Sequence, residues 1–196
     1  MNFSTAFRYA AFGMSILFYP LMSSADVVDF EQLSDSEIVT TQYAGLSFSN
    51  AVVLTSGLSL NDAEFPPYSG SNVAFDNNGS MSLSFSSQVK TVGGYFTYLE
   101  PITLIGYNAS NQPVATTSSL FSTNTALTGD AGSHPNEYLS VSFASGISKL
   151  TIAGNPNGSS FALDNLTYVS SVDEPSIFMM WLVGTGLVWF RVRHNK

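Results

Sequence analysis

The sequence predicts an all-β protein, an antiparallel β-sandwich of the jelly-roll kind, over residues 26–170. Two observations lead to this fold class. Short stretches of alternating apolar and polar residues fill this part of the chain, and no helical period runs longer than two turns. Clusters of Gly, Asn, Pro and Ser separate these stretches, as turns separate the strands of a sandwich.

The turns between the expected strands have recognisable chemistry. Asn77, Asn78 and Gly79 tolerate positive φ, and Ser145 with Gly146 between two alternating runs predicts a tight hairpin. Outward positions of the strands are mostly Ser and Thr, which predicts a neutral, hydroxyl-rich surface. The expected strands are residues 27–33, 37–43, 45–48, 51–56, 72–75, 80–87, 92–98, 102–108, 113–119, 137–144, 148–153 and 160–168.

The first 25 residues differ from this domain. They contain one charge, Arg8, then an apolar run over residues 9–21 and the small residues Ser23, Ser24 and Ala25. This order is typical of a secretory signal peptide, and it predicts cleavage after Ala25. The alternative is a buried N-terminal strand or helix.

The last residues form a second apolar segment. Residues 177–190 carry no charge, and the basic residues Arg191, Arg193, His194 and Lys196 follow directly. This arrangement predicts a membrane-directed helix with its end on the cytoplasmic side. A comfortable span needs roughly 20 apolar residues, so the segment is short, and a packed C-terminal core helix is the alternative.

Charge and composition exclude several kinds of site. Between residues 26 and 170, twelve acidic residues face only Lys90 and Lys149, a net charge of about −10, which excludes a nucleic-acid partner. Without cysteine and with His134 as the domain's one histidine, a Cys-His site is impossible and zinc lacks ligands. No G-x-S-x-G motif is present either. We therefore expect a non-enzymatic protein; a polysaccharide hydrolase using paired carboxylates is the alternative.

The C-terminal segment resembles a PEP-CTERM sorting signal. Glu174 and Pro175, a glycine-containing apolar stretch, and Arg191 with Arg193 match that family's layout, while Asp173 stands where the family has proline. The resemblance covers residues 171–196 and implies processing at Glu174 and Pro175 by an exosortase-type membrane enzyme. It also implies a Gram-negative envelope, a transient inner-membrane anchor and an extracellular or biofilm matrix. The alternatives are a permanent single-pass anchor and, less well matched, a GPI signal.

Three carboxylates stand out in the domain. Asp29 and Glu31 are two residues apart, so on a strand they project to one face. Asp164 lies where the apolar alternation slips from odd to even positions, which predicts a β-bulge. These segments, residues 28–31 and 161–166, resemble the first and last strands of galactose-binding-like, carbohydrate-binding-module domains. The resemblance implies that Asp29, Glu31 and Asp164 meet and bind a structural calcium ion; the alternative is solvated or turn-capping carboxylates.

Aromatic residues supply the expected ligand site. Tyr68, between two prolines and Ser69-Gly70-Ser71, is predicted to lie in a loop, and Tyr95 and Tyr98 are further candidates. An exposed ring offers an apolar face on which a sugar can stack; the alternative for each is packing in the core. Exopolysaccharide is thus the expected partner, and a purely structural coat protein is another possible role.

Overall fold

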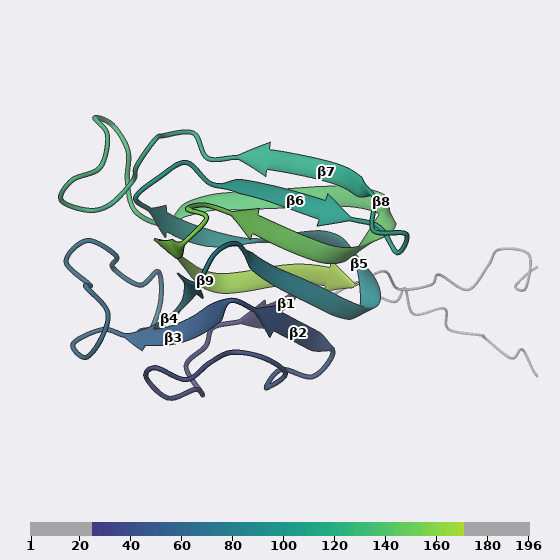
Figure 1. Cartoon of the computed structure of the whole chain (residues 1–196), viewed down its shortest axis with the longest axis horizontal. Helices are drawn as coiled ribbons and strands as arrows, with labels where there is room; N and C mark the ends of the chain where they lie inside the picture. Colours follow the sequence, from purple (N-terminus) through teal and green to yellow (C-terminus); the bar gives the residue numbers. More distant parts are fainter. Residues whose placement is uncertain (1–24, 171–196) are drawn as a thin grey trace, which may run out of the picture.

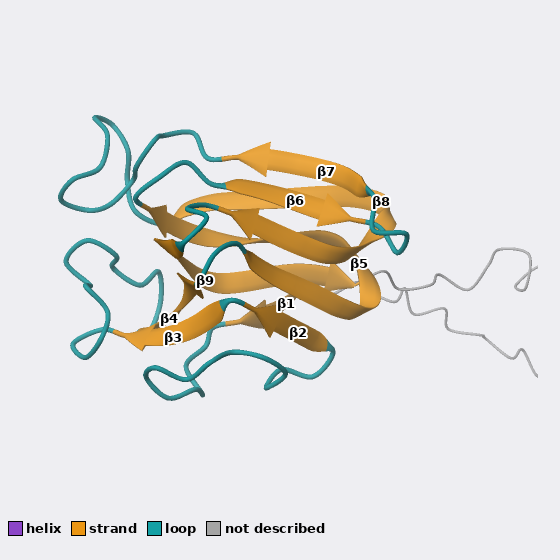
Figure 2. Cartoon of the chain, viewed as in Figure 1, coloured by secondary structure: helices purple, strands orange, loops and turns teal. Residues whose placement is uncertain are grey.

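The structure is a computed structural model that describes residues 25–170, all of it strands, turns and loops. The signal peptide predicted up to Ala25, apart from Ala25 itself, and the sorting tail predicted over residues 171–196 lie outside the described residues. Within residues 25–170, no helix has the length and hydropathy needed to cross a membrane. The all-β, antiparallel prediction is confirmed (Figures 1 and 2).

Nine strands make up the fold, and all pair antiparallel. They are β1 (Ala25–Val28), β2 (Leu46–Ser49), β3 (Ala51–Thr55), β4 (Asn72–Asn77), β5 (Met81–Tyr98), β6 (Thr103–Tyr107), β7 (Pro113–Ser118), β8 (Glu137–Ala153) and β9 (Gly158–Ser170).

Two long strands, β5 and β8, belong to both layers of the sandwich. Residues 82–85 of β5 pair with β2, and residues 81–84 pair with residues 149–152 of β8, which in turn pair with β6. Residues 91–98 of β5 pair instead with β9 and, in part, with residues 137–142 of β8. One layer is therefore β2-β5-β8-β6-β7, and the other places β3, β4 and β1 beside β9, then β5 and β8 (Figure 1).

The strand boundaries predicted within β5 and β8 are wrong, because each strand continues where it bends from one layer to the other. The hairpin expected at Ser145 and Gly146 is wrong, because β8 continues from Glu137 to Ala153, with Gly146 at φ 99°. The two strands expected over residues 80–98 are likewise the single strand β5, whose register shifts between Ser84 and Thr91. A change of alternation phase in the sequence therefore marks a strand that passes from one layer to the other.

The strand expected over residues 37–43 is also absent from the described chain. This segment is a loop with one isolated bridge, between Ile38 and Val52. The segment forms main-chain hydrogen bonds along the open edges of β2 and β3: Phe48 N donates to Thr40 O, and Val53 N donates to Glu37 O. The segment covers two sheet edges, which protects them from pairing with other chains.

Apolar side chains form two clusters on opposite faces of the layer that contains β9. The larger cluster fills the space between the layers and takes side chains such as Leu83, Leu104 and Leu163 from both. The smaller cluster, here called the outer cluster, lies on the opposite face, under residues 56–71, which connect β3 to β4. The outer cluster consists of Leu60, Phe65, Val73 and Ala162, with Leu54 and Phe75 packed against it.

Candidate functional site

Three tyrosines meet on the outer face of the layer that contains β5, β8 and β9. Tyr95 of β5 and Tyr138 of β8 are directly paired across the strands, and their ring centroids lie 5.2 Å apart. Tyr68, from the loop before β4, lies flat on Tyr95, with centroids 3.4 Å apart and an interplanar angle of 8°. We call these residues the tyrosine cluster. Tyr68 is 47% and Tyr138 48% exposed, so the two outer rings reach solvent.

Alternation along the strands explains why the cluster faces outward. Phe96 and Leu139, which follow Tyr95 and Tyr138 in the chain, are buried between the layers, so the tyrosines point the other way. The hydrogen bond with Tyr68 raises the pKa of Tyr95, and burial adds to this effect. Tyr95 therefore keeps its hydroxyl proton at neutral pH.

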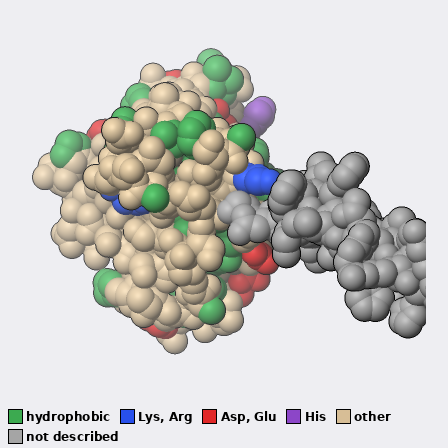
Figure 3. Space-filling model, turned by 90° about the vertical axis from the view of Figure 1, so that its right-hand side faces the viewer, with side chains coloured by type: hydrophobic (Ala, Val, Ile, Leu, Met, Phe, Trp, Pro, Cys, Tyr) green, Lys and Arg blue, Asp and Glu red, His purple; other side chains and the backbone are tan. Residues whose placement is uncertain are grey.

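A neutral row of small residues continues the same face beside the tyrosine cluster. Thr167, Gly93 and Ser140 are paired across three strands, and in the row beyond them Thr91 and Ser142 exchange a hydrogen bond of 2.9 Å. A side chain at Gly93 would overlap Leu139 and Ser140, so no side chain projects from the middle of this row beside the rings. The face thus combines apolar rings with hydroxyl groups and carries no charged side chain in these rows. In the view of Figure 3, tan, the colour of the backbone and of uncharged polar side chains, covers more of the domain surface than blue and red do.

The loop that carries Tyr68 is held by carboxylates from two other parts of the chain. Ser69 N donates to Asp164 Oδ2 at 2.9 Å. Ser71 N and Asn72 N donate to Glu31 Oε1 at 2.9 and 2.7 Å. Hydrogen bonds of Ser69 Oγ to Asn165 Oδ1 and of Asn136 Nδ2 to Pro66 O add further support.

Asp164 occupies the predicted β-bulge, which is confirmed. Gly93 pairs with Thr167 and Tyr95 pairs with Asp164, so β9 has one more residue than β5 in this interval. Asn165 takes up the extra residue with φ 45°. Asp164 is 1% exposed, and burial raises the pKa of its carboxyl to about 6, although hydrogen bonds from Ser69, Asn165 and Tyr68 oppose the rise. The charge of Glu31 adds to the increase.

The expected calcium ligands are only partly brought together. Glu31 and Asp164 both reach the Tyr68 loop, whereas Asp29 Oδ1 accepts a long hydrogen bond, 3.3 Å, from the main-chain N–H of Glu31. Among residues 25–170, no group of three or more His, Cys, Asp or Glu side chains is placed to hold a metal ion. As placed, these residues do not fit a three-carboxylate calcium site, and calcium binding stays a prediction.

Tyr98 is not a surface residue, which corrects its assignment as a stacking platform. It is fully buried, because it lies three positions after Tyr95 and so faces the core. Its hydroxyl donates to Glu137 and accepts from Phe121 N at 3.3 Å. Burial is the main cause of a strongly raised pKa for Tyr98. The residue thus supports the loop between β7 and β8.

Tyr138 is the member of the tyrosine cluster that the sequence analysis missed. Its signal is in the sequence: Tyr138, Ser140 and Ser142 alternate with Leu139 and Val141, so the tyrosine shares the outward phase with two serines. Since strands of this kind place alternate residues on opposite faces, an aromatic residue in the polar phase is exposed.

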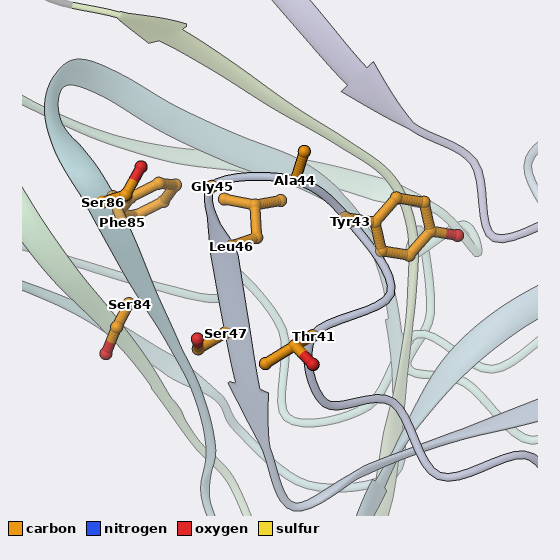
Figure 4. Close-up of a pocket in the computed structure, with 9 residues that line it drawn as sticks. All are labelled: Thr41, Tyr43, Ala44, Gly45, Leu46, Ser47, Ser84, Phe85 and Ser86. Carbon is orange, nitrogen blue, oxygen red and sulfur yellow. The ribbon is translucent and has the colours of Figure 1, made fainter.

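A separate depression of about 410 Å³ lies on another part of the molecule, where β2 meets β5 (Figure 4). Tyr43 lies at one side of it, and its ring hydroxyl points away from the depression. The lining residues are Thr41, Tyr43, Ala44, Gly45, Leu46, Ser47, Ser84, Phe85 and Ser86.

Comparison with known proteins gives structural neighbours only. No protein-family model matches the chain, and no curated protein matches it. The K2 cleaved adhesin domain of Lys-gingipain is similar with 15% identity and a TM-score of 0.48, over 74% of this chain and 99% of that one. A DUF4465 family protein from Bacteroides caccae has 12% identity and a TM-score of 0.46, over 76% and 100%. A point mutant of the family 29 carbohydrate-binding module CBM29-2 has 10% identity and a TM-score of 0.42, over 76% and 93%.

Proposed function

We propose that this chain is an exported, non-enzymatic protein that binds a neutral polysaccharide through the tyrosine cluster. The observation that carries the proposal is the stack of Tyr68 on Tyr95 beside Tyr138, two of them about half exposed, next to a row of hydroxyl side chains. Apolar rings held at the surface favour a ligand with an apolar face, and the hydroxyls supply hydrogen bonds to its polar edge. A sugar chain offers both.

The charge of the domain selects among polysaccharides. Twelve acidic residues against two lysines repel an anionic polymer at low ionic strength, whereas a neutral one is unaffected. The rows beside the tyrosine cluster consist of Thr167, Gly93 and Ser140 and then of Val169, Thr91 and Ser142. None of these side chains is charged, so none can form an ion pair with an anionic sugar. We therefore expect neutral chains to bind more tightly than uronic-acid-containing ones.

The binding experiment compares tyrosine variants by affinity electrophoresis or pull-down with exopolysaccharide. Tyr138→Ala and Tyr68→Ala should each weaken binding about tenfold, equivalent to roughly 1.4 kcal/mol. Tyr107→Ala is the matched control, because that tyrosine lies on β6, in the other layer, under Lys149. Equal binding by all the variants would contradict the proposal. Release of reducing ends from the polysaccharide would favour the alternative, a hydrolase.

We also infer export and sorting from the two ends of the chain. Ala25 is paired with Val169, so the two ends of the described domain leave it side by side. Asp164, which is paired with Tyr95, is six residues before Ser170, roughly 20 Å along an extended strand. A tail that follows Ser170 therefore starts at a distance from the tyrosine cluster, which supports a ligand face that stays accessible before and after processing.

Replacement of Glu174 and Pro175 by alanine tests the sorting proposal. If an exosortase-type enzyme processes the tail, the variant should accumulate uncleaved in the membrane fraction, detected by immunoblotting of fractionated cells. A variant with Ser170 and Ser171 replaced is the control for changes elsewhere in the linker. Processing unchanged by the Glu174 and Pro175 replacement would leave a permanent anchor as the better explanation.

A further inference from the structure

We propose that Glu31 and Asp164 are positioning residues for this binding site, because they hold the main chain of the Tyr68 loop directly and without a metal ion. The inference rests on the proposed function for its ligand. It concerns the stack of Tyr68 on Tyr95, which can be measured in the absence of any ligand.

The Tyr68 loop has little apolar anchorage of its own. Phe65 is buried in the outer cluster, but from Pro66 to Ser71 each residue is exposed or only half-buried. Tyr68 itself is 47% exposed and gains only the one ring contact with Tyr95. Burial alone therefore does not fix where the ring of Tyr68 lies.

Hydrogen bonds to two carboxylates fix the main chain of the Tyr68 loop, which burial alone does not. Asp164 binds the N–H that follows Tyr68, and Glu31 binds those of Ser71 and Asn72, so both sides of Gly70 are fixed. Hydrogen bonds to ionised acceptors are stronger than those between neutral groups. Because Glu31 follows β1 and Asp164 lies in β9, the loop is tied to two segments that are distant in sequence.

Gly70 gives independent support for this arrangement. Its φ is +58°, and a side chain at this position would overlap the Glu31 carboxylate. The loop thus approaches Glu31 as closely as a glycine allows. The bulge at Asn165 acts in the same way for Asp164, since the extra residue turns the Asp164 carboxylate toward Ser69 and places Asn165 Oδ1 against the Ser69 hydroxyl.

The same contacts explain why the carboxylates need no cation between them. Both oxygens of Asp164 accept main-chain N–H groups, from Ser69 and from Asn165. Glu31 Oε1 accepts two further N–H groups. These main-chain donors give each carboxylate two hydrogen-bond partners from the protein itself, so a bridging cation is not needed to hold the loop.

The experiment measures polysaccharide affinity and the near-ultraviolet circular dichroism of the tyrosines in the full chain. Asp164→Ala and Glu31→Ala should each lower affinity about tenfold and reproduce the near-ultraviolet change caused by Tyr68→Ala. Asp164→Asn keeps an acceptor oxygen for Ser69 N and should restore most of both signals. Asp130→Ala is the matched control, because Asp130 holds Ser122 N and Thr123 N in a different loop.

A double-mutant comparison separates positioning from general destabilisation. In the Tyr68→Ala background, Glu31→Ala should cause no further loss of affinity, since the two changes remove the same contact. Additive losses would overturn the inference, as would affinity or a tyrosine signal that disappears in EDTA and returns with calcium. If Asp164→Ala does not fold, the exposed Glu31 gives the result. If the wild type binds no polysaccharide, the proposed function fails and the near-ultraviolet signals still decide this inference.

Discussion

The two apolar clusters of this protein differ in the contacts that hold the neighbouring chain in place. The larger cluster lies between the layers and is built from buried apolar side chains of nearly every strand. The outer cluster is smaller and lies on the far face of β4 and β9. From the covering segment, residues 56–71, it contains only Leu60 and Phe65. Beyond Phe65, hydrogen bonds to Glu31 and Asp164 replace apolar contact. The larger cluster thus contributes most of the buried apolar surface, whereas the tyrosine loop is held by the outer cluster at Phe65 and by two carboxylates beyond it.

Truncation in the larger cluster should have the largest effect on stability. Leu83 is fully buried in β5, in the layer away from the tyrosine cluster. Leu83→Ala should lower the free energy of unfolding by about 2–5 kcal/mol, measured by urea denaturation. Polysaccharide affinity of the folded fraction should not change. A loss of affinity with little loss of stability would mean that the two clusters are coupled.

Truncation in the outer cluster should give the converse pattern. Phe65 contacts Phe75 edge to face, with centroids 5.3 Å apart, and is nearly buried. Phe65→Ala should lower the free energy of unfolding by about 3 kcal/mol, the low end for such changes, because a surface segment can settle into the space. It should also weaken polysaccharide binding, which Leu83→Ala should not. Unchanged binding would show that the carboxylates suffice to place Tyr68.

The smallest expected effect is a pH dependence that belongs to two buried acids of the layer that contains β9, Asp164 and Asp76. Burial raises the pKa of Asp164 to about 6 and also raises that of Asp76, which accepts hydrogen bonds from Ser160 and Phe161. Between pH 4 and 6 the folded state retains a proton that the unfolded chain releases, so this contribution to stability falls as pH rises.

Thermal unfolding of the wild type and of Asp164→Asn across this range checks the sign. The melting temperature of the wild type should fall steadily relative to that of Asp164→Asn from pH 4 to pH 6, and the difference should then stay constant. The comparison with Asp164→Asn cancels the opposite effect of Asp35, Glu37 and Glu64, whose pKa values are lowered mainly through hydrogen bonds. A constant difference would mean that Asp164 is ionised throughout.

Much of the fold follows from alternation in the sequence, and the errors of the strand prediction share one cause. The all-β class, most strand positions and the bulge at Asp164 were predicted correctly, because each leaves a pattern of period two. The corners of β5 and β8 were read as turns, since a phase change looks the same whether a strand ends or crosses between layers. Residues 37–43 have strand-like composition, but they cover edges instead of forming a ladder.

The candidate site was predictable only where side chains determine it. Tyr68 and Tyr95 were identified from residue type and context, and Tyr138 could have been found from its outward phase. Tyr98 differs from them, because it lies three positions after Tyr95 and therefore faces the core. The partners of Glu31 and Asp164 could not be foreseen, since main-chain N–H groups occur at almost every position and leave no trace in residue identity.

The position of β9 has a mechanical consequence. The chain beyond Ser170 continues from a strand that is hydrogen-bonded on both sides, to β5 and to β1 and β4. If the proposed polysaccharide is held against β5 and β8, a pull on the chain beyond Ser170 would load β9 along its length. Many hydrogen bonds then have to break together, whereas a strand at a sheet edge would peel away one bond at a time. Resistance to such a force depends on the rate of unfolding, and the pairing of β9 on both sides suits the domain to bear tension applied through its C-terminal strand.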